Sequence, residues 1–155
     1  MGVRTSAGSV LAISASTPAT FNAAGYSAVG MTYTPIGEVT DLGEFGREFA
    51  LVTHNPVDSR GTVKKKGSFN EGSMTVQLGL DTDDAGQVLA KAASLSDADY
   101  SFKLTDQKGD VYYFQGQVMS WKVGVGSVDT ITAATMVIEL TTSDGGVGVV
   151  EVLAA

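Results

Sequence analysis

Hydrophobic and polar residues alternate with two different periods in the middle of the chain. Over residues 74–80, apolar side chains occupy every second position, which is the pattern of a strand with one buried face. The same alternation returns over residues 100–105. Between them, residues 83–95 show the longer period of an amphipathic helix. The pattern therefore predicts a strand, a helix and a second strand in succession.

The predicted helix carries its acidic residues at its start and its apolar residues on one side. Acidic side chains in a first turn are favoured by the helix dipole. Thr82 or one of the aspartates that follow it is expected to cap the helix. We expect the apolar stripe to face the core, and it consists of Ala85, Val88, Leu89, Ala92 and Leu95.

The rest of the chain reads as strands and loops. A change of apolar face near Gly116 predicts a bulge or bend in a long strand. The last two strands are expected to pair as an antiparallel hairpin. A chain of 155 residues is expected to be a single domain. The further strands are predicted at residues 9–14, 35–42, 49–53, 111–123 and 131–142.

Both ends of the chain lack the pattern of a core. Residues 1–30 are small and nearly uncharged, and they are expected to form an N-terminal arm. Residues 143–155 are expected to be an apolar C-terminal tail behind a glycine-rich hinge. Apolar surface that stays exposed to water promotes association, so segments of this kind are expected to be buried against other protein surface. We therefore expect both ends to be buried on a neighbouring subunit.

A long segment without sustained period, residues 55–71, holds the densest positive charge. It predicts a long loop or a hairpin extension, and loops of this length usually bind something or are disordered. It contains Arg60, Lys64, Lys65 and Lys66, four of the ten basic residues. Such a run is usually a solvated surface. The alternative is that it docks head to tail on the acidic face of another copy.

Composition excludes several classes of function. The chain has 17 acidic and 10 basic residues, a net charge of -7, which argues against wrapping a nucleic acid. It has no cysteine, which excludes disulfides and thiolate metal sites. No apolar run has the length of a membrane span, so no membrane partner is expected.

No constellation of catalytic residues is present either. The single histidine, His54, cannot form a metal cluster, and no serine lies in a nucleophile elbow. Aspartates 81, 83 and 84 lack the glutamate that a calcium loop requires. Glu44 and Glu48 have no predicted apolar pocket that would separate their pKa values. We therefore expect no enzyme, no catalytic or metal site and no cofactor.

Several short runs, taken in order, carry a resemblance to a known family. Between residues 30 and 142 the chain resembles the major tail tube protein of long, non-contractile-tailed bacteriophages, the lambda-like siphophage tail tube family. None of the runs is catalytic, so the resemblance depends on their order and spacing. They are residues 33–41, 52–56, 60–66, 83–87, 113–118 and 128–129.

This resemblance implies a mainly β fold of two packed antiparallel sheets, sandwich-like or barrel-like, with one flanking helix. It also implies hexameric rings whose sheets join into a continuous barrel, and stacking of these rings into a tube through which the genome leaves. The protein would then belong to the virion and assemble in the host bacterial cytoplasm. Its partners would be other copies of itself, the tape measure protein and the tail terminator, with DNA in transit and not specifically bound.

The resemblance further implies that residues 55–71 reach the next ring, which makes the basic residues above the inter-ring contact candidates. A bore lined by acidic and neutral side chains would let DNA slide because it repels phosphate. Candidates for this lining are Glu38, Asp41, Thr75 and Gln77. Two alternatives remain: a tube subunit of a contractile tail or secretion-type system, and a monomeric carbohydrate-binding β-sandwich.

Overall fold

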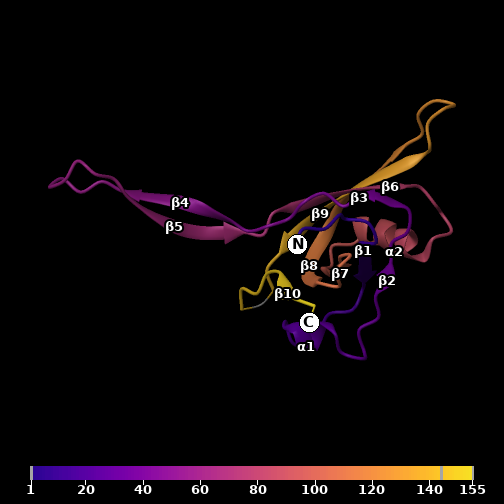
Figure 1. The fold of residues 1–155 in the computed structure, drawn as a ribbon, viewed down its shortest axis with the longest axis horizontal. Helices are drawn as coiled ribbons and strands as arrows, with labels where there is room; N and C mark the ends of the chain where they lie inside the picture. Colours follow the sequence, from indigo (N-terminus) through magenta and orange to yellow (C-terminus); the bar gives the residue numbers. More distant parts are fainter. Residues whose placement is uncertain (1, 144, 155) are drawn as a thin grey trace.

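The computed structural model describes residues 2–143 and 145–154. It confirms a mainly β fold with two antiparallel sheets and a flanking helix. The larger sheet has eight strands and curls into a half-barrel, while the second is a two-stranded arm that extends far from the body (Figure 1). Along the larger sheet the strand order is β2-β1-β7-β8-β9-β6-β3, and β10 also pairs with β8.

Most predicted strands are confirmed, including the antiparallel pair β8–β9. The helices are α1 (Ala23–Tyr26) and α2 (Ala85–Ser94). The strands are β1 (Val10–Ser14), β2 (Thr34–Pro35), β3 (Val39–Asp41), β4 (Glu48–His54), β5 (Val63–Asn70), β6 (Ser73–Gly79), β7 (Tyr100–Thr105), β8 (Val111–Gly124), β9 (Ala133–Thr141) and β10 (Val150–Val152).

The single strand predicted over residues 35–42 is divided in two. Strands β2 and β3 lie at opposite ends of the strand order, yet only residues 36–38 separate them along the chain. The sheet must therefore curl until its two ends lie close together, although β2 and β3 do not pair with each other. We call this place the seam. Glu38 adopts a left-handed conformation (φ 62°), which interrupts the extended backbone and turns the chain from one end of the sheet to the other.

Helix α2 holds this seam closed. Asp84 caps the helix by accepting the Gln87 N–H (3.0 Å), and the same oxygen accepts the Gly37 N–H (3.0 Å). The buried amide of Gln87 donates to the carbonyls of Gly37 (3.0 Å) and Gly79 (2.9 Å). Gly86 faces the Pro35 carbonyl so closely that a Cβ would lie 2.1 Å from its oxygen. Only glycine permits this approach of helix and seam.

The concave side of the half-barrel contains the core. Alternate residues of β6 and β9 are buried there in register, for example Met74 opposite Ile138 and Val76 opposite Met136. Phe102 of β7 stacks on Phe114 of β8 with ring centroids 5.3 Å apart. The period-2 pattern therefore predicted the buried face of these strands correctly.

Most of the predicted apolar stripe of α2 does not face this core. Val88 is 54% exposed and Leu95 is 85% exposed, whereas Ala90 and Ala93 are fully buried. The prediction is wrong because Gly86 must face the seam, which turns the small residues inward and leaves the larger apolar ones outside. Leu89 is partly buried against the core.

Residues 1–30 do not form a separate arm, and that prediction is wrong. Strand β1 lies inside the sheet between β2 and β7, with Leu11 and Ile13 buried. Helix α1 packs on the convex side, where Tyr26 stacks on Tyr113 at 5.3 Å. Burial raises the pKa of both phenols.

The C-terminal segment is also held by its own chain, contrary to the prediction. Strand β10 pairs with β8, and the Ala154 N–H donates to the buried carboxylate of Asp110 (2.7 Å). Arg4 forms ion pairs with Asp110 and with Asp106. Its guanidinium lowers the pKa of Asp106. The two ends of the chain are therefore fastened to the same turn between β7 and β8.

The irregularity of β8 lies three residues from the predicted position. The register shifts between Val118 and Ser120, which places the bulge at Met119. Gly116 itself pairs regularly with Leu140. Glycine is needed at this position because strand β9 lies close, and a Cβ on Gly116 would be 2.9 Å from the Glu139 carbonyl oxygen.

Candidate functional site and assembly surfaces

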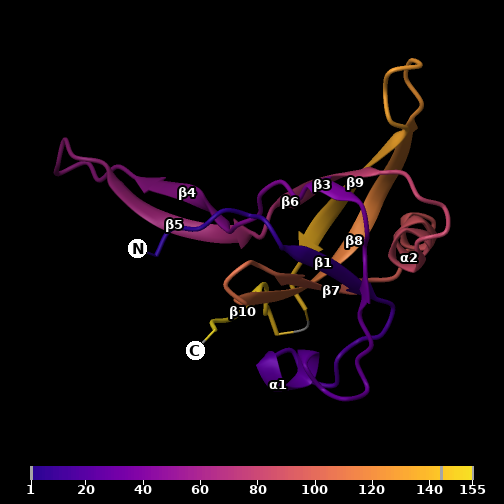
Figure 2. The same ribbon diagram turned by 45° about the vertical axis from the view of Figure 1, so that its right-hand side comes forward.

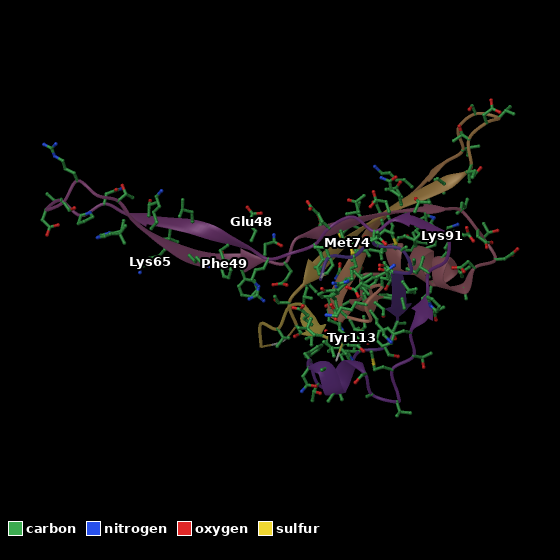
Figure 3. All side chains as sticks on the ribbon, in the orientation of Figure 1. Glu48, Phe49, Lys65, Met74, Lys91 and Tyr113 are labelled. Atoms are coloured by element: carbon green, nitrogen blue, oxygen red, sulfur yellow. The ribbon has the colours of Figure 1, made fainter. Side chains whose placement is uncertain are left out.

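The segment predicted as a loop or a hairpin extension is a hairpin, and we call β4, β5 and the residues between them the arm. The three lysines lie on strand β5 and not in a loop, while Arg60 lies in the turn at the far end. Register places Lys64 and Lys66 on one side and Lys65 on the other. Figure 3 shows Lys65 far from the body.

The arm has no core of its own. Every residue of β4 is exposed, and its apolar members include Leu51 (67% exposed) and Val52 (50% exposed). On β5, Val63 is 44% exposed. An isolated two-stranded hairpin is only marginally stable in water. The arm therefore gains little stability from burial within its own chain.

A buried carboxylate anchors the base of the arm. Glu71 accepts from Arg47 (2.6 Å) on the opposite side of the hairpin and from the Val149 N–H (3.1 Å) of the C-terminal segment. The Arg47 guanidinium lies 3.9 Å from the ring centre of Phe69. These contacts fix the direction in which the arm leaves the body. Sequence reasoning missed them, because Arg47 and Glu71 are brought together only by hairpin pairing.

Charge is distributed unevenly between the arm and the rest of the chain. The arm, residues 48–70, carries four basic and two acidic residues, a net charge of +2. The remaining sequence carries six basic and fifteen acidic residues, a net charge of -9. The arm and the rest of the chain therefore carry net charges of opposite sign.

The predicted lining residues gather on one surface, the convex side of β3, β6, β9 and β8. Asp41 pairs with Gln77, and Gln77 and Thr75 face outward between buried neighbours. Glu38 lies at the end of the same strands, where its carbonyl accepts the Gly79 N–H (2.8 Å). We call this surface the polar face, and it also includes Ser73, Gln117, Ser120, Lys122, Thr135, Val137 and Glu139.

The polar face has an open strand edge on each side. Strand β3 ends the strand order on one side. On the other side, β7 pairs with β8 only from Val111 to Gly116. From Gln117 to Gly124, the edge of β8 that faces away from β9 has no strand partner within residues 2–143 and 145–154. Open edges present unpaired backbone groups that another strand can satisfy.

A cluster of metal-ligating side chains and a membrane-spanning helix are both absent from residues 2–143 and 145–154. Among the residues that the structure describes, no three His, Asp or Glu side chains are grouped so that they could hold a metal ion. No helix in the same part of the chain is long and apolar enough to cross a membrane.

Comparison by sequence gave no match, whereas comparison by structure did. No protein-family model and no curated protein matches the chain. A chain of the anti-feeding prophage baseplate, solved by cryo-electron microscopy and symmetrised sixfold, is similar with a TM-score of 0.60 and 8% identity, over 86% of this chain and 88% of the other. A chain from the C6-symmetric tail of an empty gene transfer agent particle is similar with a TM-score of 0.58 and 12% identity, over 79% and 87%.

These identities are low, so the similarity establishes a shared fold. Both similar chains belong to phage-like tail or baseplate particles. The chain described here therefore has a fold that occurs in such particles.

Proposed function

We propose that the chain is a structural, non-enzymatic subunit of a phage-type tail, and that it forms hexameric rings which stack into a tube for genomic DNA. The observation that carries this proposal is the polar face with an open strand edge on each side. A sheet of this kind is completed when the edge of one copy pairs with the opposite edge of the next.

Ring closure follows from this pairing. Contacts between two different edges are heterologous, and such contacts close into a ring or continue as a helix. A closed barrel removes every open edge. The sixfold symmetry of the two particles that contain similar chains supports a hexamer.

In such a ring the polar face would line the bore. Its residues are neutral or acidic apart from Lys122, and Asp41, Glu139 and the adjoining Glu38 supply negative charge. A phosphate backbone is repelled by this lining, so DNA would pass without binding. The arm would then extend away from the ring and contact the next one. The ion pair between exposed Arg47 and the buried carboxylate of Glu71 at its base would hold it in place for that contact.

The remaining parts of the proposal concern the particle. We propose a long, non-contractile tail of a siphophage, assembled in the host cytoplasm. A tape measure protein would occupy the bore during assembly, and a terminator would cap the last ring. The resemblance of residues 30–142 to the tail tube family supports these partners.

A second candidate is a ring of a baseplate, or a tube of a contractile or secretion-type system. The similarity to a chain of the anti-feeding prophage baseplate favours it. All of these assemblies share the ring, and a baseplate differs from the tubes in that its rings do not stack. A monomeric carbohydrate-binding sandwich is less favoured, because it would leave two sheet edges and the apolar residues of the arm uncovered.

Negative-stain electron microscopy of the purified chain tests the proposal. Hollow fibres of indefinite length are the expected result. Discrete rings that do not stack would support the baseplate candidate. Particles of single-domain size at all concentrations would overturn both, and size-exclusion chromatography with light scattering would measure the same outcome independently.

A further inference from the structure

An apolar groove of about 370 Å³ lies between helix α2 and strand β8, at the end of the sheet opposite the arm. Figure 2 shows α2 at that end, beside the protruding β8–β9 hairpin. The groove is lined mainly by Leu80, Val88, Ala92, Leu95, Trp121 and Val123. It belongs to neither the polar face nor the arm.

The groove is an extension of the core that the chain itself does not cover. Trp121 lies opposite Met136 and packs against the core, while Val123, two residues further along, is 49% exposed. From the helix, Val88 and Leu95 project outward. Contiguous exposed apolar surface of this kind marks an interaction site.

The arm of another copy has the chemistry to fill this groove. Leu51 and Lys66 pair directly across the two arm strands, so one side of the arm presents both apolar and basic groups. The groove has Asp81 and Thr82 on its rim and Asp83 beside them, with Lys91 as a basic lining residue. Apolar groups can enter the groove while lysines face the aspartates, which is complementary in charge.

The chain's own arm cannot reach its own groove. Lys65 of the arm and Lys91 of the helix lie at opposite ends of the longest axis of the molecule (Figure 3). A donor at one end and an acceptor at the other end produce a head-to-tail contact, which can be repeated without limit.

We propose that the groove between α2 and β8 is the acceptor site for the arm of a second copy of this chain. This inference rests on the proposed function, because it assigns the surface on which one ring receives the arm of another. It also explains why most of the apolar stripe of α2 faces away from the core of its own chain. Val88 and Leu95 have the spacing of core residues because they become core residues in the assembly.

Chemical cross-linking tests the contact directly, because the chain has no cysteine. Leu51→Cys and Leu95→Cys are prepared as two separate variants, mixed, assembled and treated with a short bifunctional maleimide. Both side chains are exposed in the free chain, so folding is preserved. We expect a mixed dimer of the two variants. Val29→Cys, at a fully exposed site in the segment between α1 and β2, replaces Leu95→Cys in the control and should give no such dimer.

A second variant measures how much the groove contributes. Val88→Lys with Leu95→Lys should raise the protein concentration needed for assembly by about tenfold or more, which corresponds to losing about 1.4 kcal/mol per contact. Val29→Lys should leave it unchanged. Two results together would overturn the groove as acceptor: normal tube formation by the lysine variant, and no mixed dimer from the two cysteine variants. The proposed function would then stand. Absence of any self-association by the unmodified chain would overturn both.

Discussion

The seam of the half-barrel gives the sharpest test of how the body is held together. One carboxylate oxygen of Asp84 accepts two backbone N–H groups, from Gln87 inside α2 and from Gly37 on the seam. Asp84→Ala removes both bonds at once. It should therefore weaken the helix start and the closure of the sheet together.

The size of this effect follows from the two bonds. Loss of an N-cap costs about 1 kcal/mol. Leaving the partly buried Gly37 N–H without an acceptor costs about 1–2 kcal/mol. The free energy of unfolding should fall by roughly 2–3 kcal/mol, which lowers Tm by about 4–12 °C in a chain of this size. Asp84→Asn should cost less than about 1 kcal/mol, because its single amide oxygen can accept both N–H groups.

Urea unfolding of the unassembled chain, followed by the fluorescence of the single tryptophan, measures these differences. Trp121 is a suitable reporter because it lies on β8 beside α2. Asp83→Ala is the matched control, since that carboxylate is exposed and accepts no hydrogen bond from any described residue. If Asp84→Ala and Asp83→Ala unfold at the same urea concentration, the seam is not held by Asp84.

Three further predictions concern the arm and the ends of the chain. Changing the three lysines of β5 to glutamate should leave the unfolding curve unchanged and suppress polymerisation in sedimentation assays; fibres of normal length would contradict this. Gly148→Ala should destabilise the chain by about 1–3 kcal/mol, because the new Cβ would lie 2.4 Å from Cδ of Glu71; Gly30→Ala, in open space, is the urea-unfolding control. The Arg4–Asp106 pair should hold the N-terminal residues at pH values above the ordinary carboxyl pKa of 3.8 and release them as pH falls through the lowered pKa of Asp106. Hydrogen exchange of these residues should therefore become faster over that pH range, and Arg4→Ala should abolish this pH dependence.

The longer strands of the body, such as β6 and β9, were predictable because each has one buried face. Period-2 alternation records burial on one side, and Thr75 and Gln77 were placed correctly on the outer side for that reason. The arm was ambiguous because neither of its sides is buried, so β5 has no alternation to read. Its three consecutive lysines suit a strand whose two faces both contact water in the free chain.

The face of α2 could not be predicted from its period. Periodicity identifies an apolar stripe and does not say which molecule covers it. Val88 and Leu95 form a regular stripe that this chain leaves exposed, whereas Ala90 and Ala93 are buried by virtue of their small size. The seam could not be predicted from a local sequence pattern either, because Gly37 and Asp84 lie 47 residues apart in the sequence.

The contacts that fold the body and the contacts of the proposed assembly therefore involve different residues of this chain. The contacts that hold the body together are made within one molecule. They include those of Asp84 at the seam and those of Asp110, which binds the C-terminal segment. The arm adds little buried apolar surface, since Leu51 remains 67% exposed. Substitutions in the contacts that hold the body together, such as Asp84→Ala, should lower the unfolding free energy and reduce assembly only through loss of folded protein, whereas substitutions in the arm or the groove should reduce assembly at unchanged stability. Measuring both quantities on the same variants separates the two roles, and an arm variant that also unfolds more easily would show that the arm supports the body.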